Sequence, residues 1–167
     1  MADEDVNPGE CRPPTLEDLL TICRSLNAQA AKYIVIGGFA IMQHGFDRTT
    51  GDIDLLVEES PENQARVKRA LESLPGKAIL ELGDDDLRNY AVVRVADEVL
   101  VDLTLAACGI RYLEASSDVS SVEIRGVPIP FANLPLLLRM KQTHREKDAE
   151  DRVFLRRKIA QSPEPNE

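Results

Sequence analysis

Short apolar blocks, separated by polar breaks, predict alternating helices and strands along most of the chain. Apolar residues at helical spacing predict a helix over about 16–30, with Thr15 as its N-cap and Asp18 as a capping-box partner. Residues 33–36 form an apolar run that predicts a strand stopped by two glycines. The later expected elements are a helix over 39–44, a strand over 52–57, a helix over 61–74 capped by Ser60, strands over 90–95 and 99–104 joined by a tight turn at 96–98, an extended edge segment over 122–129, a helix capped by Asn133 through 136–138, and a helix over 145–159.

This order of elements predicts an α+β fold, in which helices pack against one small mixed β-sheet. The length of 167 residues suits one domain with one core. We expect the domain to span 15–160. Prolines and charged residues dominate 1–14 and 161–167, and these two segments are predicted to be disordered tails.

Composition excludes several classes of protein. No apolar run approaches the roughly 20 residues of a membrane span, and the acidic first ten residues do not resemble a signal peptide. The three cysteines lack metal-ligand spacing, which favours a reducing compartment over a disulfide framework. We therefore expect a cytoplasmic protein that does not bind a membrane.

The formal net charge of -9 argues against a protein built mainly to grip nucleic acid. Bases nevertheless gather late in the chain, where residues 139–158 hold eight bases against four acids. Within this region Lys141, Arg145, Asp148 and Arg152 recur at intervals of four, three and four, which predicts one helical stripe. The stripe is either a site for a triphosphate or a solvated helix face with internal ion pairs.

Asp52 and Asp54 begin the predicted strand over 52–57 and alternate with apolar residues. Successive strand side chains point to opposite faces, so the two carboxylates share one face while Ile53 and Leu55 can enter the core. Two carboxylates on one face of a buried strand repel each other unless a cation or hydrogen bonds offset the cost. Magnesium prefers such oxygen ligands and accepts substrate phosphates as the rest of its shell.

Asp102 lies in a third apolar strand, over 99–104. A neighbouring strand can bring it beside Asp52 and Asp54, and three carboxylates can then hold two metal ions about 3.5–4 Å apart. The alternative for the first two acids is a solvated strand start. Asp is disfavoured inside strands, which makes the metal-site interpretation the stronger one.

Gly37 and Gly38 lie between a strand and a predicted helix. Without side chains, the backbone here can approach a phosphate closely. A Gly-Gly pair alone is equally typical of an ordinary turn. Its position shortly before an Asp-x-Asp strand favours phosphate binding.

The chain resembles the DNA polymerase beta-like nucleotidyltransferase superfamily. The matching residues are Gly37-Gly38-Phe39-Ala40, Arg48-Thr49-Thr50-Gly51-Asp52-Ile53-Asp54-Leu55 and Val101-Asp102-Leu103. Within it, the chain is similar to the small nucleotidyltransferases of type IV abortive-infection toxin systems. This similarity rests on the late segments Ile124-Arg125-Gly126-Val127-Pro128-Ile129-Pro130, Lys141, Arg145-Glu146-Lys147-Asp148 and Asp151.

The resemblance implies a nucleotidyltransferase fold and a reaction that needs magnesium. By it, Asp52 and Asp54 hold two Mg2+ ions, Asp102 holds the catalytic ion, and Gly37 and Gly38 cradle the triphosphate. Many members of the superfamily carry Gly-Ser at this turn, and Gly38 cannot supply that hydroxyl. Phosphate binding then relies on backbone N–H groups and on other side chains of the chain, namely Arg48, Thr50, Lys141 and Arg145.

The sequence therefore predicts an enzyme that moves a nucleoside monophosphate from a nucleoside triphosphate, such as ATP, to an acceptor and releases pyrophosphate. The toxin resemblance implies tRNA or protein as acceptor and an antitoxin as partner. A small-molecule enzyme of the antibiotic-modifying kind is the first alternative, mildly favoured by the acidic composition. A non-catalytic nucleotide-binding module is the second, and the complete set of three aspartates argues against it.

Overall fold

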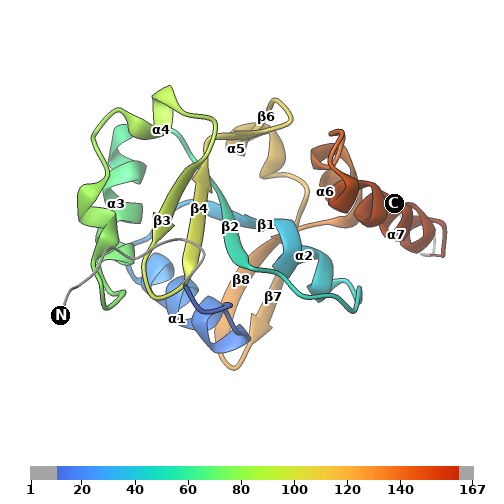
Figure 1. The fold of residues 1–167 in the computed structure, drawn as a ribbon, viewed down its shortest axis with the longest axis horizontal. Coiled ribbons are helices and arrows are strands. Elements are labelled where there is room, and N and C mark those ends of the chain that lie inside the picture. The colour runs from blue at the N-terminus through green and yellow to red at the C-terminus, as the bar shows by residue number, and fades with distance from the viewer. Residues whose placement is uncertain (1–10, 162–167) are drawn as a thin grey trace.

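The computed structural model describes residues 11–161 and shows a central β-sheet with helices around it (Figure 1). The strands of this sheet are β1 (Tyr33–Ile36), β2 (Asp52–Val57), β3 (Val93–Ala96), β4 (Leu100–Thr104), β7 (Val119–Ile124) and β8 (Val127–Ala132). A separate small pair consists of β5 (Ala106–Ala107) and β6 (Ile110–Arg111). The helices are α1 (Leu16–Ala28), α2 (Gly37–Gln43), α3 (Pro61–Leu71), α4 (Asp86–Asn89), α5 (Tyr112–Ala115), α6 (Leu134–Met140) and α7 (Glu146–Gln161), with a 3-10 turn over Ala78–Glu81.

The six-stranded sheet has the order β3-β4-β2-β1-β8-β7. Strand β2 pairs in parallel with β4 and antiparallel with β1, and β1 pairs in parallel with β8. The predicted mixed sheet and the α+β class are therefore confirmed. Strands β1 and β2 have the predicted bounds.

Alternation along β2 separates a core face from a polar face. Ile53 and Leu55 are fully buried, as predicted from their spacing, whereas Asp52 and Asp54 are partly exposed. Burying an aliphatic side chain of this size stabilises the fold by about 1.5–3 kcal/mol. Helices α2 and α6 pack together, and residues of both line a cavity with Asp54. The start of α2 and the end of α6 therefore lie beside Asp54 on the polar face.

Side-chain caps fix the starts of several helices. The Thr15 hydroxyl accepts a hydrogen bond from the Asp18 N–H, and the Asp18 carboxylate accepts one from the Thr15 N–H, which confirms the capping box of α1. Ser60 caps α3, and Asn133 caps α6, both as predicted. Helices α1 and α3 end two and three residues earlier than predicted, at Ala28 and Leu71.

The prediction of one extended edge segment over 122–129 is wrong. This region is a hairpin, in which β7 and β8 pair antiparallel. Arg125 and Gly126 form the turn, with φ values of 51° and 81°, and positive φ at both positions is the hairpin geometry that matches strand twist. Strand β8 is internal and β7 is the edge. Pro128 is tolerated in β8 because the pairing with β1 occurs further along, at Phe131.

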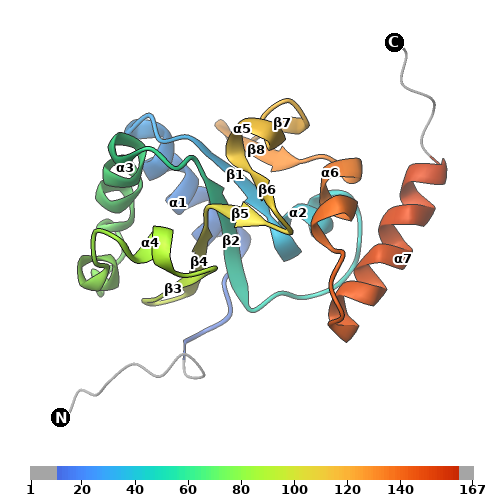
Figure 2. The ribbon, with the colours of Figure 1, turned by 90° about the horizontal axis from the view of Figure 1, so that it is seen from above.

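The predicted helical stripe over 141–152 is also wrong. Helix α6 ends at Met140 with Lys141 as its C-cap, and α7 begins only at Glu146. The break places Lys141 and Arg145 on different elements. Figures 1 and 2 both show α7 at one end of the molecule, with α3 and α4 at the opposite end.

Both predicted tails extend beyond the part of the chain that the structure describes. Residues 1–10 and 162–167 lie outside it. Arg12 lies inside the predicted N-terminal tail and makes ion pairs with Asp18 and Glu98. Among the described helices, none is long and apolar enough to cross a membrane.

Candidate active site

Pairing of β2 with β4 brings the three predicted aspartates together. Asp54 stands directly opposite Asp102 in the parallel register, and Asp52 shares the face of Asp54. One carboxylate oxygen from each residue lies within 4.8 Å of the others, close enough to share a metal ion. The expectation of adjacent strands with carboxylates in common metal reach is confirmed.

Burial and the neighbouring carboxylates raise the pKa of Asp54. Burial is the largest cause that raises its pKa, and repulsion from Asp52 and Asp102 adds to it, so that the pKa reaches about 8. The charged form therefore lacks sufficient compensation within the protein near neutral pH. Three hard oxygen donors that repel one another fit a divalent cation, which would supply the missing positive charge.

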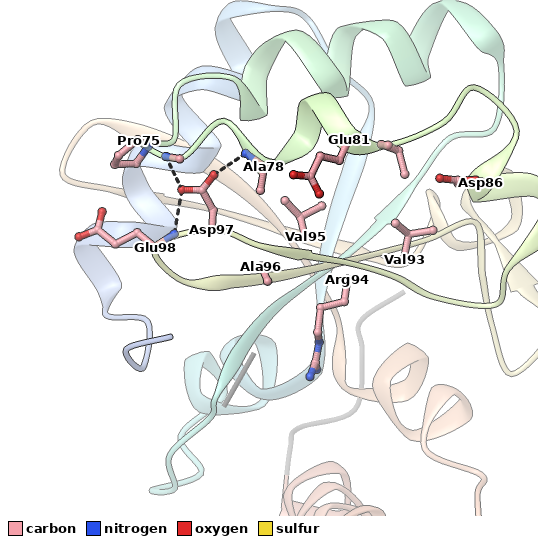
Figure 3. Close-up of a pocket in the computed structure, with 12 residues that line it drawn as sticks. Pro75, Ala78, Glu81, Asp86, Val93, Arg94, Val95, Ala96, Asp97 and Glu98 are labelled. Carbon is pink, nitrogen blue, oxygen red and sulfur yellow. Dashed lines mark hydrogen bonds between the residues drawn. The ribbon is translucent and has the colours of Figure 1, made fainter. Parts of the chain in front are cut away.

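Arg94 on β3 is a residue of the site that the sequence prediction missed. Its Nε and Nη2 each lie 2.8 Å from an oxygen of Asp102, and Nη2 lies 2.9 Å from Asp52. Figure 3 shows its side chain leaving β3 on the side opposite to Val93 and Val95. A partial signal was present: folded at the turn over 96–98, the predicted hairpin pairs Arg94 with Leu100, whereas the observed register pairs it with Asp102, two residues further along on the same face.

The two glycines make room for site residues. A Cβ atom on Gly37 would overlap the carboxylate of Asp54, and the φ of Gly37 is 72°. A Cβ atom on Gly38 would lie 2.5 Å from Oγ1 of Thr50. The absence of side chains at this turn therefore lets β2 and the preceding loop pack directly against the start of α2.

The loop before β2 holds Arg48 and Thr50 beside this turn. The Thr50 hydroxyl donates to the carbonyl of Asp52 at 3.1 Å, which ties the loop to the first aspartate. The Arg48 side chain is mostly buried, and its Nε lies 3.2 Å from Asp151 of α7. Arg48 thus joins the Gly-Gly turn to the C-terminal helix.

The C-terminal candidates form an ionic cluster around two buried aspartates. Lys141 is buried, and its Nζ lies 3.2 Å from both Asp148 and Asp151. The guanidinium of Arg145 donates two hydrogen bonds to Asp148, at 3.0 and 3.1 Å, and these bonds orient it. Burial by itself would raise the pKa of Asp148, but hydrogen bonds from Arg145 and Thr143 outweigh it and lower the pKa to about 2.

Two adjoining cavities open over the aspartates. The first, of about 190 Å³, is polar and includes Gly38, Arg48, Thr50, Arg94, Lys141, Arg145 and Lys147 in its lining. The second, of about 370 Å³, has apolar walls that include Val92, Ala106, Ala107, Leu137 and Met140. Both are lined by Asp54 and Asp102. All of the predicted phosphate-binding residues except Gly37 therefore line the polar cavity, and Gly37 lines the second one.

A larger cavity, of about 790 Å³, lies against β3 (Figure 3). Asp97 in its wall accepts hydrogen bonds from the N–H groups of Gly76, Ala78 and Glu98. This carboxylate therefore fastens the segment after α3 to the turn after β3. Its hydrogen bonds explain why an acid is buried there.

Comparisons with known proteins identify the family. The family described as "Nucleotidyl transferase AbiEii toxin, Type IV TA system" matches residues 18–135, more than two thirds of the chain. No curated protein matches the chain. A solution structure of the antibiotic-resistance factor ANT(2'')-Ia is similar at 18% sequence identity, with a TM-score of 0.55, over 86% of this chain and 85% of that one.

The structural similarity shows a shared fold, and the family match covers Gly37, Gly38 and all three aspartates. The cluster around Lys141 lies beyond the matched residues. The chain belongs to the nucleotidyl transferase AbiEii toxin family of type IV toxin–antitoxin systems.

Proposed function

We propose that the protein transfers a nucleoside monophosphate from a Mg2+-bound nucleoside triphosphate to an acceptor, with release of pyrophosphate. The observation that carries this proposal is the set of three carboxylates within 4.8 Å, in a chain of a nucleotidyltransferase family. The complete set favours catalysis over a module that only binds nucleotide. Mg2+ would neutralise the charge that develops on the transferred phosphoryl group and on the leaving pyrophosphate.

Each aspartate has a distinct role in this proposal. Asp52 and Asp54, on one face of β2, would hold both Mg2+ ions. Asp102 on β4 would help to hold the catalytic ion and would accept the proton of the attacking hydroxyl. The raised pKa of Asp54 supports the assignment, because a cation beside it would restore the ionised form that burial and the neighbouring carboxylates disfavour.

The triphosphate would lie in the 190 Å³ cavity, along the start of α2. Gly38 lies in the wall of this cavity and Gly37 in the wall of the adjoining one. The side chain of Arg145 is 70% exposed, which leaves its outer N–H groups available for phosphate. Arg48 and Lys141 are bonded to buried aspartates. We therefore assign them to positioning the loop and to the positive field of the cavity. Thr50 holds the loop to β2.

Family membership implies a nucleoside triphosphate substrate and an antitoxin. For the acceptor we propose tRNA or a protein, because the chain belongs to a toxin family of nucleotidyl transferases. The second candidate is a small cationic acceptor, such as an aminoglycoside. The formal net charge of -9 is the observation that favours it.

The test is transfer of label from each of the four α-labelled triphosphates, with Mg2+ and a cell extract. Label that resists protease and disappears with ribonuclease identifies RNA, and the reverse pattern identifies protein. A parallel reaction replaces the extract with purified aminoglycosides. The Asp102→Asn variant and a chelator provide the background. If no fraction is labelled above that background in any reaction, the proposed transfer is wrong.

A further inference from the structure

Arg94 contacts the aspartates in a way that the proposed transfer does not use. Its Nη2 bonds to Asp52 at 2.9 Å and to Asp102 at 2.8 Å, and its Nε bonds to the second oxygen of Asp102. The guanidinium therefore lies between the two carboxylates and engages both oxygens of Asp102.

A metal ion shared by these two acids needs the same position. Mg2+ binds carboxylate oxygens at about 2.0–2.1 Å, and a guanidinium at hydrogen-bonding distance from those oxygens would lie close enough to repel it. Both cations also compete for the same oxygens of Asp102. Metal binding must therefore displace at least the Nη2 group of Arg94.

The structure leaves Arg94 able to move. It lies on the edge strand β3, and its side chain is 43% exposed, compared with 14% for Arg48 and 8% for Lys141. The latter two bond to the buried pair Asp148 and Asp151. Arg94 instead bonds to the candidate metal ligands, and it also lines the 190 Å³ cavity assigned to the triphosphate.

We propose that Arg94 is an internal counter-ion. Its guanidinium lies between Asp52 and Asp102 until a nucleotide binds, and the side chain then moves so that the guanidinium binds the triphosphate. This inference rests on the proposed function. It means that the protein binds a divalent cation alone weakly and binds a cation that is complexed with a nucleotide more tightly. Only the nucleotide supplies phosphate oxygens that can replace the carboxylates as partners of Arg94. Arg94 thus couples metal binding to nucleotide binding.

The experiment compares Arg94→Gln with the parent protein and with Arg88→Gln. Arg88 is exposed on α4 and pairs with Asp85, so this control loses the same charge away from the aspartates. Binding of Mn2+ alone is measured by electron paramagnetic resonance. Binding of a non-transferable triphosphate analogue is measured by calorimetry at saturating Mg2+. Circular dichroism and thermal unfolding confirm that each variant is folded.

We expect Arg94→Gln to shift the two affinities in opposite directions. Mn2+ alone should bind about tenfold more tightly, because a charge-assisted competitor is gone, and the analogue should bind about tenfold more weakly, because a phosphate ligand is gone. Arg88→Gln should match the parent in both measurements. Arg94→Lys should give an intermediate Mn2+ affinity, since one ammonium cannot engage both oxygens of Asp102 and Asp52 together.

An Arg94→Gln variant that binds Mn2+ no more tightly than the parent overturns the inference, and so does one that loses both affinities together. If that variant does not fold, Arg94→Lys decides alone, and a Mn2+ affinity equal to the parent's overturns the inference. If the parent protein binds the triphosphate analogue with the same affinity with and without Mg2+, the proposed function is contradicted instead. The measurement with Mn2+ alone still reports on Arg94 in that case.

Discussion

Replacing Gly37 by alanine is the sharpest test of how the backbone builds the site. The added Cβ would overlap the carboxylate of Asp54 and would lie 2.9 Å from the Cβ of Asp54. Rotation of the carboxylate alone cannot relieve the second contact, so β2 has to shift. The φ of 72° adds strain for any residue with a side chain, of about 1–2 kcal/mol.

Alanine substitutions at two other glycines separate the effect of backbone strain from the effect of a steric clash. Gly126 has a φ of 81° and nothing within 4 Å of an added Cβ, so alanine there brings strain without a clash. Gly51 has neither feature. We expect Gly51→Ala to leave stability and binding unchanged. Gly126→Ala should lower the melting temperature by about 2–4 °C for each kcal/mol of strain and leave binding intact.

Gly37→Ala should lower the melting temperature by at least as much as Gly126→Ala and should also remove most Mg2+-dependent nucleotide binding. Thermal unfolding gives the first quantity, and calorimetry with a triphosphate analogue gives the second. If Gly37→Ala binds the metal–nucleotide complex as tightly as Gly126→Ala does, then the close approach of Gly37 and Asp54 has no part in the site.

Three further predictions concern charge. The pKa of Asp54 is 3.8 in the unfolded chain and about 8 in the folded protein. The folded state therefore binds the Asp54 proton more tightly, and the resulting stabilisation is complete below pH 3.8 and is lost as the pH rises to about 8. Metal-free protein should therefore become less stable between these limits in pH-dependent unfolding, and Asp54→Asn should flatten the profile. Asp102→Asn should keep metal-dependent nucleotide binding yet lose most transfer, which rate and affinity measured together will show. Lys141→Met should lower the free energy of unfolding by about 3–5 kcal/mol, because it leaves buried aspartates short of a cation; the exposed Arg157→Met should change it little.

Each of these predictions has an outcome that contradicts it. An unfolding profile as steep in Asp54→Asn as in the parent would assign the pH dependence to other groups. Transfer at the parent rate by Asp102→Asn at saturating Mg2+ would remove Asp102 from the chemistry. Equal stability of the Lys141→Met and Arg157→Met variants would mean that the cluster around Lys141 contributes nothing to the fold.

Local periodicity explains what the sequence predicted well. Alternation in β2 depends only on neighbouring residues, and it was sufficient to place Asp52 and Asp54 on one face and Ile53 in the core. The position of Asp102 needed one more step, the pairing of two apolar strands, and the register confirmed it. The expected metal site was accessible from sequence because it is built on strands rather than on loops.

Features that depend on a partner elsewhere in the chain were missed. Arg94 alternates with valines, and a polar residue in such a strand is read as facing solvent until its partner Asp102 is known. The break after Lys141 has no proline or glycine to mark it, since 142–145 read Gln-Thr-His-Arg. Helical spacing therefore continued across it. The cluster formed by Lys141 and Arg145 exists because the chain turns there and both residues reach Asp148.

The formal charges of the five acids and five bases around the site cancel, and on the proposed function this balance allows a protein with a formal net charge of -9 to bind a triphosphate. The surrounding acids are Asp52, Asp54, Asp102, Asp148 and Asp151, and the bases are Arg48, Arg94, Lys141, Arg145 and Lys147. A free triphosphate would meet no net attraction there and would face three carboxylates at close range. On the proposed function, a triphosphate that carries Mg2+ would meet those same carboxylates as ligands and would release Arg94 to bind its phosphates. We therefore expect the arrangement of acids and bases to favour the metal–nucleotide complex over either component alone.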